Sequence, residues 1–313
     1  SASPNMRRWE QYRTPEHLAD ALAILREPGG SAAIVAGGTD LLLDLQQERH
    51  PAVKTLVDVS RVGEMLEVAE RAGWIEIGAA VPLNEIIRHP LVRANADCLV
   101  EASGLIGGPQ VRNVATLGGN VAHALPAGDG TIALLALGSE ALLAGTDGTR
   151  WQPLENLFEA PGKTTFDQTR EILVGFRFPA KRPDEASAFY RVMRPQGVAI
   201  AILNMATRIK FAADYTVLEA ALAVGPAGPR PLRARAAEAA LLGRNLDEST
   251  LEDTVAALLS EVELRTSPHR ATAEYRRHLL RTLLRRTLLG AERRLRSAAN
   301  ADSNGAGPEP DHR

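Results

Sequence analysis

The 313-residue sequence has few of the residues that ligate metals or iron–sulfur clusters. Cys98 is its single cysteine, whereas the common iron–sulfur clusters need about four cysteine ligands. One thiol cannot form a disulfide within the chain. Because cysteine is among the most buried residue types, we expect Cys98 to be inert and semi-buried rather than reactive. Any iron–sulfur centre that works with this protein must therefore lie in another chain.

The spacing of the histidines gives no metal site either. The seven histidines form no HExxH or HxxxH pair, and no cysteine stands near enough to complete a common zinc pattern. A GxSxG sequence is absent, which argues against a Ser-His-Asp hydrolase. We therefore predict no metal ligands and no catalytic acid, base or nucleophile in this chain.

Charge, aromatic content and hydropathy argue against three further classes of protein. The formal net charge is −2 and aromatic residues make up 4% of the chain, so there is little support for nucleic-acid binding. No apolar run approaches the roughly twenty residues that a membrane helix needs. Residues 1–10 lack the apolar core of a signal peptide, and we expect a cytoplasmic protein.

Two glycine pairs are the most informative features that the sequence does contain. Gly37-Gly38 follows the apolar stretch 32–35 and precedes the apolar run 41–45, so it marks a turn from a strand into a helix. Gly118-Gly119 follows the segment 107–113, which is dense in glycine and amide side chains. Amides in such turns can point outward and bind a diphosphate. Neither pair matches GxGxxG or GxxxxGK[ST], which argues against the usual dinucleotide fold and the nucleoside-triphosphate loop.

A purely structural interpretation of these glycines is also open. Glycine is the default residue of tight turns, and for either pair alone a tight turn is the more common explanation. The two pairs together, with the polar residues around them, favour a cofactor site.

Five short segments follow one another in a characteristic order along residues 7–290. They are AGGTDL at 36–41, QVRN at 110–113, TLGGN at 116–120, PAGD at 126–129 and AEYRR at 273–277. Together they resemble the FAD-binding medium subunit of molybdenum hydroxylases, a family that includes the flavoproteins of xanthine dehydrogenase and aerobic carbon monoxide dehydrogenase.

This resemblance implies which residues bind FAD. Both glycine turns would hold the diphosphate and ribityl regions, mostly through backbone amides, and Asp129 would accept a hydrogen bond from a polar group of the cofactor. Ile106 and Leu173 would contact the flavin ring, and Tyr190 stands where some relatives have a lysine. The implied set is Ile34, Val35, Ala36, Gly37, Gly38, Thr39, Asp40, Leu41, Ile106, Ala115, Thr116, Gly118, Gly119, Asn120, Asp129, Leu173 and Tyr190.

Two polar residues near the turns carry separate expectations. A carboxylate that faced a diphosphate would be repelled, so we expect Asp40 to cap the amides of the following helix. His123 follows the second turn and has three open roles, a contact to FAD, a proton shuttle or a structural loop histidine, of which the structural role is favoured.

The resemblance also implies a function and partners. The chain would be an electron-transfer subunit that passes electrons from [2Fe–2S] clusters in a small partner subunit to an external acceptor, while a large molybdopterin subunit oxidises the substrate. The complex would be a dimer of heterotrimers. The alternatives are a self-contained FAD-dependent oxidoreductase of the same binding fold and a non-enzymatic scaffold. The substrate and the acceptor, whether NAD, oxygen or a quinone, stay open.

The fold class that we predict is α+β, with two domains. Residues 6–179 would form a two-subdomain FAD-binding fold of the vanillyl-alcohol-oxidase-like (PCMH) type, divided into 6–58 and 59–179, with FAD in the cleft between them. Residues 184–291 would form a three-stranded antiparallel sheet covered by helices. Residues 292–313 are expected to be a disordered tail. The arginines on the helix 272–289 are interpreted as a solvated face, with an acidic partner surface as the alternative.

Overall fold

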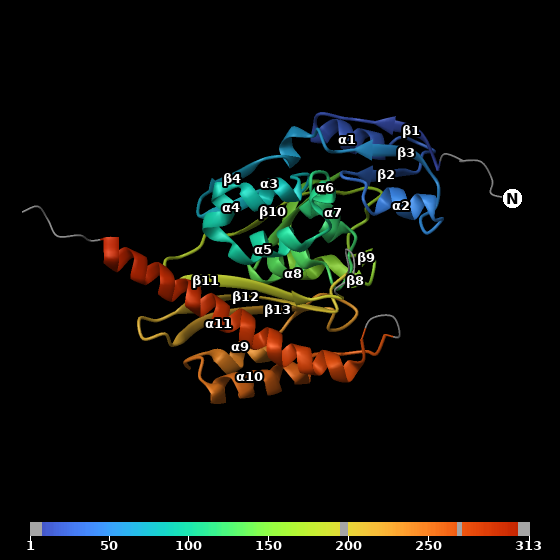
Figure 1. Ribbon diagram of the computed structural model, residues 1–313. Helices are drawn as coiled ribbons and strands as arrows, with labels where there is room; N and C mark the ends of the chain where they lie inside the picture. The colour runs from blue at the N-terminus through green and yellow to red at the C-terminus, as the bar shows by residue number, and fades with distance from the viewer. Residues whose placement is uncertain (1–7, 195–199, 268–270, 306–313) are drawn as a thin grey trace, which may run out of the picture.

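The structure, a computed structural model, describes residues 8–194, 200–267 and 271–305. Within these ranges the chain forms three main sheets, each with its own helices, and the mixed α+β class is confirmed. The sheets follow one another from top to bottom of the molecule in chain order (Figure 1). No helix in this part of the chain is long and apolar enough to cross a membrane.

The first sheet is parallel and has three strands in the order β1-β3-β2. Its strands are β1 (Trp9–Arg13), β2 (Ala32–Val35) and β3 (Val53–Asp58), and the connecting helices are α1 (Leu18–Leu25) and α2 (Leu41–Gln46). Parallel neighbours need crossover connections, which α1 and α2 provide. The strand and the helix expected on either side of the first glycine pair are present as β2 and α2, but β1 is a strand that the sequence pattern did not indicate.

The second sheet is antiparallel and has five strands in the order β4-β5-β10-β6-β7. They are β4 (Val68–Arg71), β5 (Trp74–Gly78), β6 (Glu140–Gly145), β7 (Gly148–Pro153) and β10 (Ile172–Pro179). Between β5 and β6 the chain makes six helices, α3 (Leu83–Arg88), α4 (Pro90–Asn95), α5 (Asp97–Leu105), α6 (Pro109–Arg112), α7 (Leu117–Ala122) and α8 (Asp129–Ala136). Short elements η1 (Gly63–Met65), η2 (Leu154–Leu157), β8 (Phe158–Ala160) and β9 (Lys163–Thr164) complete this region.

Helix α8 lies at the centre of the molecule. All of its residues from Asp129 to Ala136 are buried. It packs on α5 and α7 on one side and on the third sheet on the other (Figure 1). Apart from Asp129 and Thr131 its residues have no polar side chain, so the helix has to be covered on every face, and it meets this condition by lying between two layers.

The third sheet has four strands in the order β11-β12-β13-β14, so the prediction of three strands was wrong. They are β11 (Glu185–Val192), β12 (Leu203–Phe211), β13 (Val217–Gly225) and β14 (Leu232–Arg233). Two residues are too few to produce an alternating pattern, and β14 exists because Leu232 and Arg233 pair with Val224 and Ala223.

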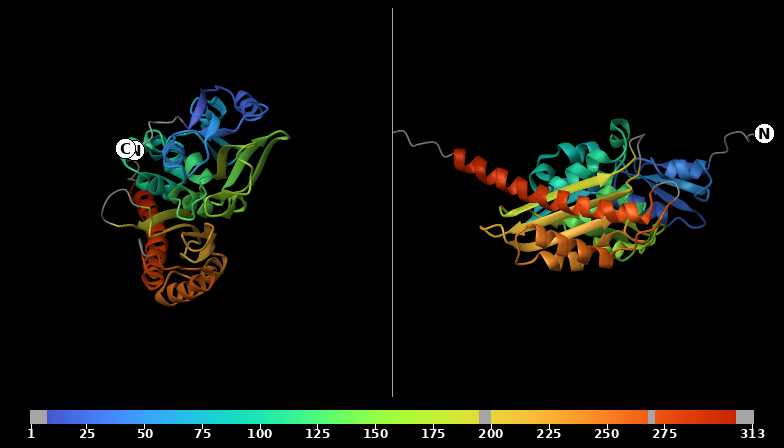
Figure 2. Two further views of the ribbon diagram at one scale, coloured as in Figure 1. Left: turned by 90° about the vertical axis from the view of Figure 1, so that its right-hand side faces the viewer. Right: turned by 60° about the horizontal axis from the view of Figure 1, so that its bottom comes forward.

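Three helices, α9 (Arg235–Leu241), α10 (Glu248–Glu261) and α11 (Ala273–Gly305), cover the face of the third sheet opposite α5 and α8. Figure 2 shows this layering from two further sides. Leucines 279, 280, 283, 284 and 288 of α11 are buried in the core beneath the sheet, as their helical spacing predicted.

Helix α11 continues to Gly305, so the prediction of a disordered tail that begins at residue 292 was wrong for residues 292–305. The stretch after Gly290 is rich in alanine and arginine, which are strong helix formers, and Ala291 and Leu295 pack on the third sheet. The last turns extend past the edge of the sheet (Figure 1). Residues 306–313 lie outside the described residues.

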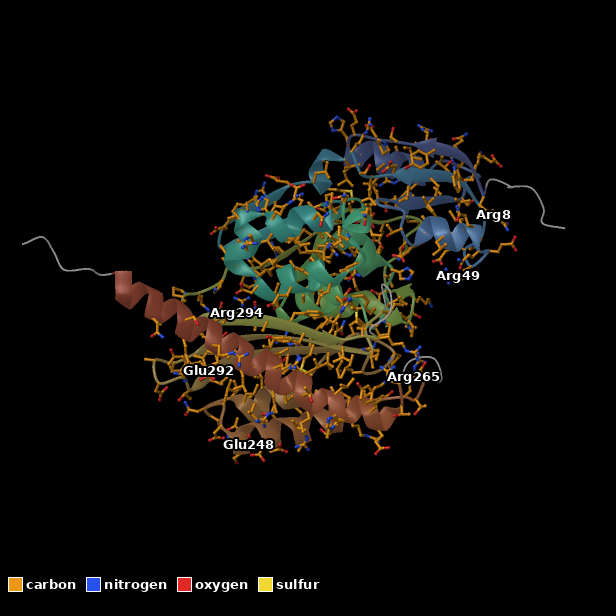
Figure 3. The ribbon with its side chains drawn as sticks, in the orientation of Figure 1. Arg8, Arg49, Glu248, Arg265, Glu292 and Arg294 are labelled. Atoms are coloured by element: carbon orange, nitrogen blue, oxygen red, sulfur yellow. The ribbon has the colours of Figure 1, made fainter. Side chains whose placement is uncertain are left out.

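Several arginines of α11 form ion pairs within the molecule while their side chains stay partly exposed. Arg285 contacts Glu248 of α10 at 2.7 Å, and Arg281 pairs with Glu252. Arg294 pairs with Glu101 of α5 where α11 crosses β11 (Figure 3). The arginine face therefore joins α11 to neighbouring helices on both sides of the sheet.

Candidate cofactor site

The two glycine turns, far apart in the sequence, lie against each other. The first turn, residues 36–40, connects β2 to α2. A Cβ atom on Gly37 would lie 2.2 Å from the carbonyl oxygen of Val114, which precedes the second turn by two residues. Only glycine permits this approach of one backbone to the other. The structure therefore brings together the residues that the sequence analysis assigned to one diphosphate site.

The first turn presents free backbone donors. The N–H groups of Gly37, Gly38, Thr39 and Asp40 donate no hydrogen bond to any group in the described chain. Gly38 has φ of +68°, a conformation that favours glycine, and its carbonyl accepts from the amide of Leu42 at 3.2 Å. Thr39 and Asp40 are exposed. Adjacent unpaired amides at a strand-to-helix turn are the donor set that an anionic group requires.

The expectation that Asp40 caps α2 was wrong. Asp40 occupies the N-cap position, but its side chain makes no capping hydrogen bond. Its backbone has φ −105° and ψ −53° instead of the extended conformation from which an aspartate reaches the N2 or N3 amide. The amides of the first turn consequently have no acceptor among the residues that the structure describes.

The second turn is built differently, because the protein already uses its amides. Thr116 is the N-cap of α7 and its Oγ1 accepts from the Gly119 amide at 3.0 Å. The Gly118 amide donates to the carbonyl of Ala79 at 2.9 Å, and the Asn120 amide donates to the carbonyl of Thr116. A Cβ on Gly118 would lie 2.5 Å from the Ala79 oxygen, so this glycine is required for packing. Gly119 is exposed.

A hydrogen-bond network fixes the loop before the second turn. Arg112 Nη1 donates to the carbonyls of Ile106 (3.2 Å) and Gly107 (2.8 Å). Its Nε donates to Asn84 Oδ1, and Asn84 Nδ2 donates to Asn113 Oδ1 at 2.6 Å. The half-buried Ile106 is therefore held in place by Arg112, which the sequence analysis singled out only as part of a motif. Asn84 was missed, and no local signal marked it.

Leu173 is close to the second turn, because two backbone hydrogen bonds of Ala79 link its neighbour Val174 to that turn. The amide of Ala79 donates to the carbonyl of Val174 at 2.8 Å, and the carbonyl of Ala79 accepts from Gly118. Leu173 itself is buried in the main core at an irregularity in the pairing of β10 with β6. Ile34 and Ala36 pack against the same core, while Leu41 packs on the small core beneath the first sheet.

Asp129 lies in a buried polar cluster that joins α8 to the third sheet. Its Oδ1 accepts from Asn204 Nδ2 of β12 at 2.6 Å, and its Oδ2 forms an ion pair with Arg191 of β11. The side chains of Asp129 and Arg191 are 5% and 7% exposed. Burial raises the pKa of the Asp129 carboxyl, and the Arg191 charge and the Asn204 hydrogen bond oppose this rise.

Tyr190 is separated from this cluster. Side chains alternate along β11, so Tyr190 and Arg191 point to opposite faces of the sheet. A Cβ on Gly290 of α11 would lie 3.3 Å from Tyr190 Cε2, which places the tyrosine on the helix-covered face. The structure does not bring Tyr190 together with Asp129. Ser187, Phe189 and Arg191 alternate with Tyr190 along the strand, and this alternation would have indicated Arg191 as the residue that faces Asp129.

The remaining candidates have simple surroundings. His123 is half-buried at the C-cap of α7, and its backbone amide donates to Gly119 at 3.1 Å. The thiol of Cys98 lies 3.9 Å from the carbonyl oxygen of Ala133. Cys98 is fully buried, and this burial raises the pKa of its thiol to about 12. An inert buried thiol is what the sequence analysis favoured. In the part of the chain that the structure describes, no group of three or more His, Cys, Asp or Glu side chains is placed to hold a metal ion.

The residues present fit the diphosphate of FAD. The first turn supplies free amides and no blocking side chain at its glycines, and the second turn lies directly against it. Ile106 supplies half-buried apolar surface, Leu173 lies buried in the main core close to the second turn, and Asp129 supplies one buried carboxylate.

Comparison with known proteins places the chain in context. Residues 6–181 match the family described as the FAD binding domain in molybdopterin dehydrogenase, and residues 188–291 match the CO dehydrogenase flavoprotein C-terminal domain. The chain is similar to the xanthine dehydrogenase FAD-binding subunit of Escherichia coli O157:H7, with 29% identity over 88% of this chain and 94% of the relative.

Two further similarities involve carbon monoxide dehydrogenases. The carbon monoxide dehydrogenase medium chain of Hydrogenophaga pseudoflava is 28% identical over 90% of this chain and 96% of the relative. A solved structure of carbon monoxide dehydrogenase from the same organism, lacking the Mo-pyranopterin moiety of its cofactor, superimposes with a TM-score of 0.86. That match has 28% identity and covers 93% of this chain and 99% of the other.

Proposed function

Because this chain belongs to the family of FAD-binding medium subunits of molybdopterin hydroxylases, we propose that it binds one FAD and is the electron-transfer subunit of a heteromeric complex. Bound FAD would transfer electrons from [2Fe–2S] clusters of a partner chain to an external acceptor. One observation carries the assignment of the site: the four unpaired amides of residues 37–40 lie against the loop that leads into the second glycine turn.

The two turns have different tasks in this proposal. Residues 34–41 bind the diphosphate, because the amides of residues 37–40 within this segment have no acceptor in the described protein. Residues 115–120 form the opposite wall, where Thr116 and Ala79 fix the shape of the turn and the exposed surface of Gly119 meets the cofactor. Ile106 and Leu173 exclude water beside the flavin ring. Asp129 accepts a hydrogen bond from the cofactor with a lone pair that Arg191 and Asn204 leave free.

The partners follow from the family and from what its relatives are called. A similar protein is named as the medium chain of a carbon monoxide dehydrogenase, and another as the FAD-binding subunit of a xanthine dehydrogenase. We place the [2Fe–2S] clusters in a small subunit and the molybdopterin in a large subunit, with substrate oxidation there. A dimer of heterotrimers is the expected assembly, since closed two-fold assemblies are the commonest.

The domain boundaries belong to the same proposal. Residues 6–179 form the FAD-binding domain of the PCMH type, with subdomains 6–58 and 59–179 that correspond to the first two sheets. Residues 184–291 form the C-terminal domain, which includes the third sheet and the packed part of α11.

Expression of the chain alone tests this function. The purified protein is expected to carry about one FAD per chain, seen in its visible spectrum, with no stoichiometric iron or molybdenum and no substrate hydroxylation. Co-expression with its partner subunits should allow substrate to reduce the flavin. Turnover by the isolated chain would support the self-contained oxidoreductase instead, and a colourless protein that takes up no added FAD would support the scaffold.

A further inference from the structure

The loop Pro126–Asp129 is held by the third sheet as well as by its own domain, where the Gly128 amide donates to the carbonyl of Leu125 at 3.1 Å. Asn204 Nδ2 of β12 donates to the carbonyl of Ala127 at 3.0 Å as well as to Asp129. A Cβ on Gly225 of β13 would lie 2.1 Å from the carbonyl oxygen of Pro126. The strands of the C-terminal domain therefore form the floor on which this loop rests.

The opposite end of α8 is held by the same sheet. Arg208 of β12 donates to the carbonyl of Leu137 at 3.2 Å, and Arg233 of β14 donates to the carbonyl of Leu135 at 3.3 Å. Asn204 and Arg208 are four positions apart on β12, so the strand between them is about 13 Å long. This length matches the roughly 12 Å length of the eight-residue helix. Strand β12 thus spans α8 lengthwise and contacts both ends.

The two ends differ in one respect that concerns the cofactor. At the C-terminal end the arginines bind main-chain carbonyls of α8, and their charges are balanced by Glu185 and Glu238, which belong to the C-terminal domain itself. At the N-terminal end the charge of Arg191 is balanced by Asp129 of the FAD-binding domain. Arg191 Nη2 also contacts Met193 Sδ at 3.0 Å, which helps to fix the guanidinium.

We infer that Arg191 is a positioning residue of the FAD site: it holds the Asp129 carboxylate ionised and in one orientation, so that FAD affinity depends on a charge supplied by the C-terminal domain. This inference rests on the proposed function. Around Asp129, β11 contributes the charge of Arg191, β12 the neutral Asn204, and α7 the neutral Asn120, which accepts from Thr131. Without Arg191 a buried carboxylate would have no opposite charge and would take up a proton more readily.

The test is FAD affinity in the full-length chain, measured by flavin fluorescence for variants whose circular dichroism shows that they are folded. Arg191→Gln is expected to weaken FAD binding by about tenfold to a hundredfold, the range for loss of a hydrogen-bonded charge, and Arg191→Lys should restore most of the affinity. Arg233→Gln is the matched control, because it removes one of the two arginine contacts at the other end of α8 and should leave FAD affinity within about twofold of wild type.

Two readouts separate a positioning role from a structural one. In a double-mutant cycle, Asp129→Asn should weaken binding in the wild-type background but add little in the Arg191→Gln background. The FAD affinity of Arg191→Gln should also begin to fall at a higher pH than that of wild type when the solution is acidified, because its Asp129 is protonated earlier.

Three outcomes would overturn this inference. One is equal loss of affinity in Arg191→Gln and Arg233→Gln, the second is additivity in the cycle, and the third is an unchanged pH profile. If Arg191→Gln does not fold, Arg191→Lys and Asp129→Asn still test the inference. It requires near-wild-type FAD binding in Arg191→Lys and weakened FAD binding in Asp129→Asn. Wild-type protein that binds no FAD would instead contradict the proposed function itself.

Discussion

Gly37 and Gly119 belong to the same proposed site, yet their surroundings predict different effects of substitution. In Gly37→Ala the new Cβ would collide with the Val114 backbone, so we expect the free energy of unfolding to fall by about 1–3 kcal/mol, the range for overpacking. Urea denaturation measures this. Gly104→Ala is the control, because a Cβ there meets open space and alanine favours the helix, and a matching loss in the control would contradict the explanation.

Gly119 should be more important for the cofactor than for the fold. A Cβ at Gly119 would approach only Thr116 Oγ1, at 3.3 Å, and the residue is exposed. In Gly119→Val we expect a folded protein whose Kd for FAD is raised by at least about tenfold, because the side chain occupies the surface where the backbone meets the ligand. Unchanged FAD affinity in a titration of this folded variant would remove the second turn from the site.

Local sequence identified the glycine turns but not how their polar neighbours act. Asp40 and Thr116 are both good N-cap residues and both occupy N-cap positions, but only Thr116 has the extended backbone that lets its side chain reach an amide. The position of Tyr190 was likewise decided by strand register, which a one-residue shift reverses. Backbone dihedrals and register depend on tertiary packing, and a residue-by-residue comparison with a family cannot supply them.

At the scale of the element, α11 gives a prediction that separates apolar packing from charge. Leu284 is fully buried, and Leu284→Ala should lower the free energy of unfolding by about 2–5 kcal/mol through lost burial and a cavity. Arg285, by contrast, pairs with Glu248, which lies on the outer side of α10 (Figure 3), and Arg285→Gln should cost less than about 1 kcal/mol. Chemical denaturation of both variants compares them directly, and equal losses would show that the ion pair contributes far more than exposed pairs usually do.

Elements with a repeating apolar pattern were predictable, and elements defined by a partner were not. The leucine spacing on α11 and the alternation on β12 and β13 follow from burial of one face. Strand β1 is mostly exposed and β14 is two residues long, so neither has a pattern of its own. Both exist because a neighbouring strand offers hydrogen bonds, β3 for the first and β13 for the second.

At the scale of the whole molecule, the sequence predicted three units but not how closely the third is joined to the second. Helix α8 is buried between them, and its ends contact residues of β11, β12 and β14. These contacts join positions about 60 to 100 residues apart, and side chains that bind across such separations leave no periodic signal. The same contacts imply that the two domains unfold together.

Cys98 offers a probe of this joint unfolding, because it lies at the boundary between the two domains. Its backbone amide donates to Ser187 Oγ of β11 at 3.2 Å, its thiol faces the carbonyl of Ala133 in α8, and burial raises its pKa to about 12. A thiol reagent at pH 8 needs a thiolate that it can reach, so the native protein should be labelled only through opening of this boundary.

The labelling rate of Cys98 should therefore follow global unfolding. We expect it to rise with urea in parallel with the loss of circular dichroism, and to fall when FAD is added, because a ligand that binds only the native state stabilises it by mass action. Quenched labelling followed by mass spectrometry measures the rate. Rapid labelling in the absence of urea, or a rate that FAD leaves unchanged, would mean that the C-terminal sheet separates from α8 without disturbing the cofactor site, and the two domains would then be independent units.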